Sequence, residues 1–257
     1  MLEIFSFRSL THTLPLADRR AQPRRWAVFL QCGAGAVWGG WWKQGSENWD
    51  LIINHYDATY AGKIPCDVEF RQSGRLPGSK FTAFYSLLTE YPHILDPYEY
   101  ILLLDDDVQF PEGGIQRLFE ITQQNDWEMA QASLSADSFC AYPVFFNSGR
   151  GGWRRVNGVE IMMPVYARRI FPWVREVFAE SISGWGADAA LAAIGMREGW
   201  RAAVVDEVVA RHLKPVLGES GAYYQMLRRN GIDQEREFEY LQSKYGFTTP
   251  LFYEMPG

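Results

Sequence analysis

Residues 98–107, Tyr-Glu-Tyr-Ile-Leu-Leu-Leu-Asp-Asp-Asp, place three adjacent carboxylates directly after the strongest strand signal of the chain. A short apolar run bounded by polar residues predicts a buried strand. Similar runs at 26–31 and 49–54 predict two more strands, and apolar residues at helical spacing predict helices over 79–91 and 112–125. Strands that alternate with helices indicate an α/β fold with a mostly parallel sheet flanked by helices.

The rest of the chain continues this alternation. Further apolar runs predict three strands, at 128–134, 159–166 and 201–205. Helices are predicted over 172–180 and 187–194. From residue 221 onward the sequence is rich in Tyr, Leu and Phe, and we expect a helical C-terminal part.

The composition of the 257 residues narrows the class of protein. Hydrophobic residues make up 47% and aromatic residues 15%, so the chain can bury enough surface to fold. With 25 basic and 31 acidic side chains the formal net charge is −6, whereas a dedicated nucleic-acid binder needs a basic surface. Cys32, Cys66 and Cys140 are unclustered, so neither a disulfide framework nor a zinc site is expected, and a cytoplasmic location fits best.

No stretch has the pattern of a targeting or membrane segment. Residues 1–20 are too polar for a signal peptide and lack a long apolar region. The uncharged stretch 26–42 contains several glycines, whereas a spanning helix needs about 20 predominantly apolar residues. We therefore interpret 26–42 as a strand followed by a glycine-rich loop.

The three carboxylates of Asp105, Asp106 and Asp107 repel one another, so a compensating positive charge is expected beside them. A hard divalent cation, Mn²⁺ or Mg²⁺, prefers such oxygen ligands. Alternation along an extended segment places Asp105 and Asp107 on one side and turns Asp106 away. The simpler interpretation is an exposed acidic turn that caps the following helix.

Two metal-handling folds place Asp-x-Asp after an apolar strand. In haloacid-dehalogenase-like phosphatases the motif usually lies near the N-terminus and has Thr or Val at its fifth position, where this chain has Gln109. In GT-A glycosyltransferases the motif follows the strand that completes the nucleotide-binding half. The position of residue 105 suits this second fold.

Three motifs together resemble the GT-A glycosyltransferases. Residues 98–108 are similar to their metal-binding strand, and Ser-Gly-Trp-Gly-Ala-Asp at 183–188 is similar to the Gly-Trp-Gly element of several inverting families. Residues 204–212 resemble the C-terminal strand and loop that supply a metal-binding histidine. His93, 98–107, 184–188 and 212–218 also resemble a little-characterised GT-A-like family of plants and bacteria. The resemblance implies a single GT-A-like domain over 1–257, with a nucleotide-binding half (about 20–135), an acceptor half (about 136–218) and C-terminal helices (219–257).

The resemblance also implies roles for individual residues. Asp107 is the first candidate metal ligand and His212 the second, while Asp105 contacts the ribose or sugar, or reaches the metal through water. Asp188 is the candidate general base, although a carboxylate at the start of a helix also interacts favourably with the helix dipole. Trp185 is a candidate for stacking on a sugar face. Asp106 is assigned to the same donor-binding region without a definite role.

Weaker signals surround this set. Asp57 follows a predicted strand and is a candidate for binding the base or ribose, but a turn aspartate explains it equally well. Lys80 begins a predicted helix and is a candidate diphosphate contact or a solvated surface lysine. Other candidates are the glycine loop 33–35, which follows the first strand, and a lid at 147–155, in which Arg150, Arg154 and Arg155 are candidate anion contacts. Trp153, Tyr223 and Tyr224 are candidate aromatic residues of an acceptor groove.

We expect a metal-dependent glycosyltransferase that moves a sugar from a nucleotide-diphosphate donor to an acceptor hydroxyl with inversion. The expected partners are a nucleotide-sugar and a glycan or lipid-linked acceptor, with peripheral membrane contact if the acceptor is a lipid, and no nucleic acid. A metal-dependent phosphotransferase or nucleotidyltransferase would use the same triplet on a phosphate. A non-catalytic nucleotide-sugar or glycan-binding protein of the same fold is the other alternative.

Overall fold

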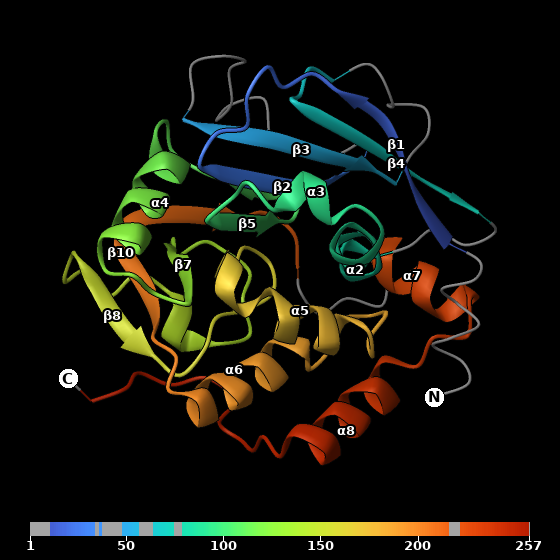
Figure 1. The fold of residues 1–257 in the computed structure, drawn as a ribbon. Helices are drawn as coiled ribbons and strands as arrows, with labels where there is room; N and C mark the ends of the chain where they lie inside the picture. Colours follow the sequence, from blue (N-terminus) through green and yellow to red (C-terminus); the bar gives the residue numbers. More distant parts are fainter. Residues whose placement is uncertain are drawn as a thin grey trace.

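A computed structural model of the chain describes residues 11–33, 36–37, 48–56, 64–74, 79–215 and 222–256 (Figure 1). Within these ranges, ten strands form one sheet in the order β1-β4-β3-β2-β5-β9-β7-β10-β6, with β8 paired to β10. The strands are β1 (Thr11–Asp18), β2 (Trp26–Cys32), β3 (Trp49–His55), β4 (Val68–Gly74), β5 (Tyr100–Leu104), β6 (Val108–Gln109), β7 (Met129–Leu134), β8 (Trp153–Val156), β9 (Val165–Ala167) and β10 (Ala202–His212).

The sheet is mixed, so the α/β class is confirmed and the expectation of a mostly parallel sheet is wrong. Strands β4, β3, β2 and β5 are parallel to their neighbours in this row, and β7 is parallel to β10. Between the two parallel groups, β9 runs antiparallel to both β5 and β7. The chain enters β9 by returning along β5, with Leu103 N donating to Pro164 O at 2.9 Å and Asp105 N to Met162 O at 2.9 Å. An apolar run predicts a strand but carries no direction, which is why the sequence did not reveal this reversal.

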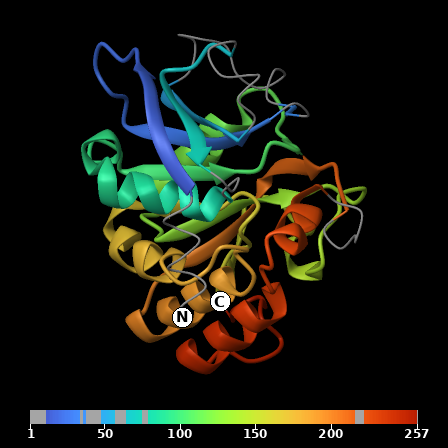
Figure 2. The same ribbon diagram turned by 90° about the vertical axis from the view of Figure 1, so that its right-hand side faces the viewer.

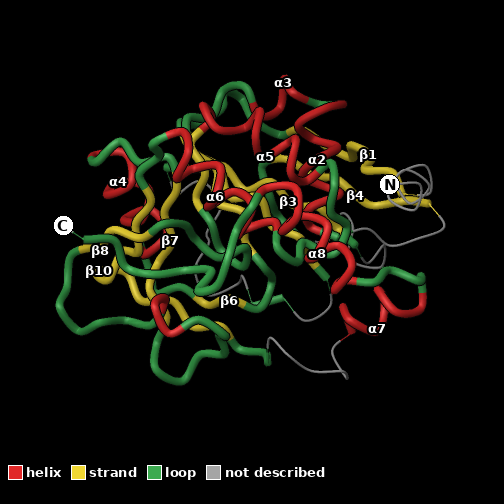
Figure 3. The backbone as a smooth tube through the Cα atoms, turned by 90° about the horizontal axis from the view of Figure 1, so that it is seen from below, coloured by secondary structure: helices red, strands yellow, loops and turns green. Residues whose placement is uncertain are grey.

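Helices cover both faces of the sheet. They are α2 (Lys80–Glu90), α3 (Pro92–Leu95), α4 (Gly114–Gln124), α5 (Phe171–Phe178), α6 (Ala187–Glu198), α7 (Ala222–Arg229) and α8 (Gln234–Tyr245). Helices α2, α5, α6 and α8 pack in succession, whereas α4 packs on β7 and β10 (Figures 1 and 3). No helix in the described ranges has the length and apolar character needed to cross a bilayer.

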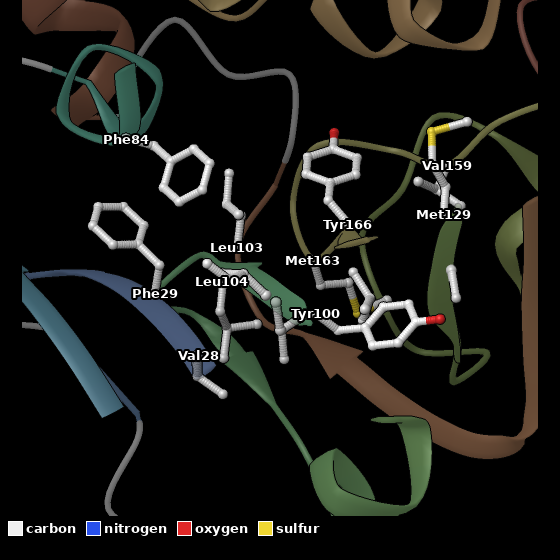
Figure 4. Packing of buried hydrophobic residues seen from close by; sticks show 14 of the residues in the cluster. Val28, Phe29, Phe84, Tyr100, Leu103, Leu104, Met129, Val159, Met163 and Tyr166 are labelled. Carbon is white, nitrogen blue, oxygen red and sulfur yellow. The ribbon is translucent and has the colours of Figure 1, made fainter. Parts of the chain in front are cut away.

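Alternate side chains of β2 explain how the two helical layers attach to the sheet. Trp26 stacks on Phe119 of α4 with ring centroids 5.3 Å apart. Phe29 points to the opposite face because the side chains of a strand alternate, and it meets Phe84 of α2 at 5.3 Å (Figure 4). The sheet therefore has an apolar layer on each side, and its central strands β2, β3, β5, β7 and β9 are buried along their whole length.

The predicted elements agree with the structure over most of the core and differ mainly at the edges of the sheet. The strands predicted at 26–31, 49–54 and 128–134, the strand before Asp105 and the four helices predicted with bounds are present with shifts of a few residues, and the C-terminal part is helical as expected. Strands β1, β4, β6 and β8 were not predicted, and the strand expected at 159–166 is only the short β9. Strand β10 continues past residue 205 through a bulge and ends at His212, so this histidine lies on the strand and not in a loop after it.

Phe84 offers a direct test of the α2 layer. Its ring is fully buried and also meets the edges of Phe171 and Phe178, so Phe84→Ala is expected to lower the free energy of unfolding by about 3–5 kcal/mol. Urea unfolding followed by circular dichroism measures this change. The exposed Met196→Ala on α6 is the control, with an expected change within about 0.5 kcal/mol. Equal losses in the two variants would contradict this packing.

Candidate functional site

A cavity of about 1080 Å³ opens beyond the carboxyl ends of β2, β3 and β5, where open α/β sheets bind ligands. Its lining includes Asp105, Asp106, Asp107, Lys80, His212 and Lys214, which we call the triplet end. It also includes Glu160, Ile161, Asp188, the turn 183–186 and side chains of α7 and α8, and Lys80 contacts residues of both sets. In the view of Figure 2, α7 lies between the end of β10 and α8. Seven of the eight site residues expected from the sequence line this cavity, and the eighth, Asp57, lies outside the described residues.

The aspartate triplet forms a turn and not a continuation of the strand. Strand β5 ends at Leu104, and Val108 N donates to Asp105 O at 3.4 Å to close the turn before β6. All three carboxylates line the cavity, so the expectation that Asp106 faces away is wrong. The alternation rule applies only while the backbone stays extended, which it does not here.

Lys80 is neither a solvated surface lysine nor a free cation for a diphosphate. Its side chain is buried, and the ammonium group contacts Asp105 Oδ1 at 2.6 Å and the carbonyl oxygens of Ile161 at 2.5 Å and Met162 at 3.4 Å. Ser79 forms a capping box at the start of α2, which fixes the backbone from which Lys80 extends. The lysine thus neutralises Asp105 and ties α2 to the segment that leads into β9.

Asp106 holds the glycine loop that follows β2. Its Oδ2 accepts hydrogen bonds from Gly33 N at 3.1 Å and from the Tyr56 hydroxyl at 2.8 Å. Burial raises the pKa of Asp106, against these hydrogen bonds and the charge of Lys214. The carboxylate therefore connects the ends of β2, β3 and β5 at the edge of the sheet, and its oxygens are already engaged.

Asp107 and His212 are brought together by backbone pairing. His212 is paired with Val108 across β10 and β6, and Leu213 N donates to Asp107 O at 3.0 Å. This register places His212 Nε2 3.3 Å from Asp107 Oδ1, with Lys214 Nζ 3.7 Å from the other carboxylate oxygen. Although burial opposes both charges, the hydrogen bond and the charges within the pair lower the pKa of Asp107 and raise that of His212 to about 9.

The Asp107 carboxylate and the His212 imidazole are suitable ligands for a divalent cation, but together they provide only two ligands. His212 Nδ1 lies 2.7 Å from Phe139 O and donates a proton there. While His212 is charged, Nε2 carries the second proton toward Asp107, so a metal would bind Nε2 only by displacing that proton. Within the part of the chain that the structure describes, no three His, Cys, Asp or Glu side chains are grouped to hold a metal. Protein cations (Lys80, His212 and Lys214) also supply part of the positive charge that the triplet requires. Any metal here would take its remaining ligands from a substrate or water.

Asp188 lies at the first turn of α6, where a turn of two left-handed glycines presents it to the cavity. Gly184 and Gly186 have φ values of 76° and 80°, and a Cβ on Gly184 would lie 2.1 Å from the Phe81 ring. Asp188 Oδ1 accepts a hydrogen bond from Ala189 N at 2.8 Å, as expected for a carboxylate at a helix N-terminus. Trp185, between the glycines, is partly exposed in the cavity and meets Tyr224 edge-on at 6.2 Å.

A buried carboxylate of α8 anchors this turn, and the sequence analysis did not identify it. Glu237 accepts hydrogen bonds from Ser183 N at 2.8 Å, Ser183 Oγ at 2.5 Å, Ser181 Oγ at 3.0 Å and Ile182 N at 3.2 Å. The available signal was its position: Glu237 precedes the buried Leu241 and Tyr245 by four and eight residues, so it occupies an apolar stripe. An acidic residue on the buried side of a helix requires partners there.

Glu160 is a second buried acid of the site that the sequence analysis missed. Its Oε2 accepts a hydrogen bond from Met162 N at 2.8 Å, and its own N donates to Gln131 Oε1 at 2.8 Å. Burial, with the charge of Asp188, raises the pKa of Glu160 to about 8, and burial raises that of Asp188 to about 7. The available signal was an acid within the apolar run 159–166.

The segment 147–155 is not positioned as an anion-binding lid. Arg154 is buried and forms an ion pair with Asp206 at 2.7 Å, and Arg150 binds Glu254 at 2.7 Å. Part of the segment is strand β8, which pairs with the start of β10, far along that strand from His212. Of the aromatic residues proposed for an acceptor groove, Tyr223 and Tyr224 line the cavity, whereas Trp153 packs on Trp127.

Comparison with known proteins gives no relative from which a function can be carried over. No family model matches the chain, and no curated protein matches it. Among solved structures, the chain is similar to the crystal structure of A197 from STIV, with a TM-score of 0.43 and 12% sequence identity over 74% of this chain and 86% of that chain. A likeness of this size does not bear on function.

The anchor of the Gly-Trp-Gly turn can be tested by removing the charge of Glu237. Glu237→Gln places an amide nitrogen among N–H and O–H donors, so we expect the free energy of unfolding to fall by about 2–3 kcal/mol. Glu239→Gln, an exposed change two residues along the same helix, should change it by no more than about 0.5 kcal/mol. Urea unfolding of both variants makes the comparison. A Glu237→Gln protein as stable as the control would show that the anchor contributes little.

Proposed function

We propose that the chain is a metal-dependent glycosyltransferase that uses a nucleoside-diphosphate sugar and inverts the anomeric centre. One observation carries the proposal: a single cavity is lined both by the aspartate turn with His212 and by the buried Asp188. Diphosphate binding requires cations and metal ligands, whereas deprotonation of an acceptor requires a base. The candidate metal ligands, the cations and the candidate base all line one cavity, and they come from segments far apart in the sequence.

The donor end is suited to a diphosphate. Asp107 and His212 would hold Mn²⁺ or Mg²⁺, which would offset the charge that develops on the leaving diphosphate. Lys214 is half-exposed beside the pair and supplies a further positive charge at the same place. Asp105 is neutralised by Lys80, so in this proposal it accepts hydrogen bonds from sugar or ribose hydroxyls.

The acceptor end is suited to proton removal. The raised pKa of Asp188 lies close to neutral pH, where a general base is most effective. As the acceptor oxygen bonds to the anomeric carbon, its proton moves to the Asp188 carboxylate. The bond from the anomeric carbon to the diphosphate breaks, and its electron pair leaves with the diphosphate. Attack from the side opposite the leaving group inverts the configuration.

Metal-dependent donor binding tests the first half of the proposal. In a thermal-shift screen of nucleoside diphosphates with and without Mn²⁺, we expect at least one ligand to raise the melting temperature of the wild-type protein more when the metal is present. A ligand at 100 times its Kd stabilises a protein by about 2.7 kcal/mol. Asp107→Ala and His212→Ala should lose the increment that depends on Mn²⁺, because each removes one of two ligands.

Asp137→Ala is the control for these variants, because this exposed carboxylate pairs with Arg211 away from the cavity lining. It should keep the full metal-dependent shift. If Asp107→Ala retains that shift as well, the metal assignment is wrong.

The proposed base is tested by Asp188→Asn. We expect normal donor binding and a rate of transfer lowered by at least about 10²-fold, because the amide cannot accept the acceptor's proton. The assay uses a panel of nucleoside-diphosphate hexoses with methyl hexosides as acceptors and measures released nucleoside diphosphate; a phosphotransferase or nucleotidyltransferase would release other products. Glu198→Gln, at the exposed end of the same helix, is the control and should keep its rate. Full turnover by Asp188→Asn would exclude this residue as the base.

A further inference from the structure

Glu160 and Asp188 are two buried carboxyl groups that line the same cavity, and Asp188 accepts a hydrogen bond from the backbone of Ile161, the residue after Glu160. Neither forms an ion pair with a basic side chain of the described residues, although the buried ammonium of Lys80 acts on both from the neighbouring triplet end. Two such groups in a low-dielectric site cannot both ionise easily, so a proton is retained on one of them over part of the pH range.

The hydrogen bonds indicate which carboxyl retains the proton. Asp188 lies at the positive end of the α6 dipole and accepts hydrogen bonds from the backbone N–H groups of Ala189 and Ile161. Among the described residues, the hydrogen-bond donor to the Glu160 carboxyl is the Met162 N–H, which bonds Oε2. Because N–H donors favour the charged form of a carboxyl group, Asp188 ionises first and Glu160 keeps the proton.

We propose that Glu160 acts as a carboxylic acid beside the base: its second oxygen carries a proton and donates a hydrogen bond to the acceptor, on an oxygen next to the attacking hydroxyl. The Met162 N–H already engages Oε2, so Oε1 is the oxygen left for this role. An acceptor recognised in this way has oxygens on adjacent carbons, as carbohydrates do. The contact with the acceptor rests on the proposed function, whereas the retained proton does not.

The groups around Glu160 are consistent with a neutral acid. Lys80 and Asp105 act on it from the triplet end and Asp188 from α6. The remaining titratable neighbours are neutral thiol and phenol groups, those of Cys140, Tyr142, Tyr166 and Tyr224. Burial and the charge of Asp188 raise the pKa of Glu160 to about 8, which sets the pH above which the proposed donor is lost.

The pH dependence of transfer by two variants tests the contact. In the wild-type protein, transfer should decline as the pH rises through about 8, because Glu160 loses the proton it donates. In Glu160→Gln, the amide oxygen takes the place of Oε2 and the NH₂ group donates at every pH, so the rate at pH 9 should match that at pH 7.5. Glu160→Leu should be at least about 10-fold slower at all pH values, because it has no donor. Glu198→Gln should behave as the wild type.

A merely structural role for Glu160 gives a different result: Glu160→Gln would then keep the alkaline decline, and the contact would be refuted. A Glu160→Gln protein that is slow at all pH values would refute it as well.

The proton on Glu160 is tested without substrate by the melting temperature between pH 5 and pH 9. A carboxyl whose folded pKa is raised stabilises the folded state below its unfolded pKa, and this contribution is lost as the pH rises through the folded value. Glu160→Gln should therefore show a smaller decline than the wild type, by roughly 3–5 °C for each unit of pKa shift removed. Glu198→Gln should decline as the wild type does.

An unchanged decline in Glu160→Gln would show that Glu160 carries no proton. If the wild-type protein turns over no donor of the panel, the proposed function fails, and the melting experiment still decides whether Glu160 is protonated.

Discussion

A single buried ammonium group, that of Lys80, connects the parts of the site. It neutralises Asp105 at the end of β5 and donates hydrogen bonds to the carbonyl oxygens of Ile161 and Met162. A buried cation is tolerated only where such partners surround it, so α2, β5 and the segment before β9 must hold these positions together. The same segment carries Glu160, and the position of this acid in the cavity therefore depends on a lysine that also pairs with Asp105.

The acidic residues of the cavity fall into two sets, which differ in whether a cation pairs with them. At the triplet end, the cations Lys80, His212 and Lys214 pair with the three carboxylates and offset part of their charge. Glu160 and Asp188 form the other set, and burial raises the pKa of each, which disfavours their charged forms. A substrate with a negatively charged diphosphate and a neutral sugar rich in hydroxyl groups would match these two sets. This match is why the proposed function uses a nucleotide-sugar and not two charged substrates.

The local sequence was enough to predict most of the strands and helices, but it could not reveal contacts between residues far apart in the chain. The apolar run before Asp105 predicted β5 and the polar edge beyond it, because both depend on neighbouring residues. The burial of Lys80 could not be predicted, since its carbonyl partners lie about eighty residues away in the chain. The proximity of His212 to Asp107 followed in the sequence analysis only from resemblance, and in the structure it results from the register of β6 and β10. Glu160 was detectable as an acid in an apolar run.

The anchoring of the Gly-Trp-Gly turn by Glu237 has a consequence for the order in which the site is completed. Ser183 and its anchor are 54 residues apart in the chain, and the anchor lies in α8. During synthesis the N-terminal parts of a domain leave the ribosome first, so the aspartate turn is made long before the carboxylate that fixes the opposite wall of the cavity. The Gly-Trp-Gly turn therefore gains its anchor only after α8 has been made and has docked.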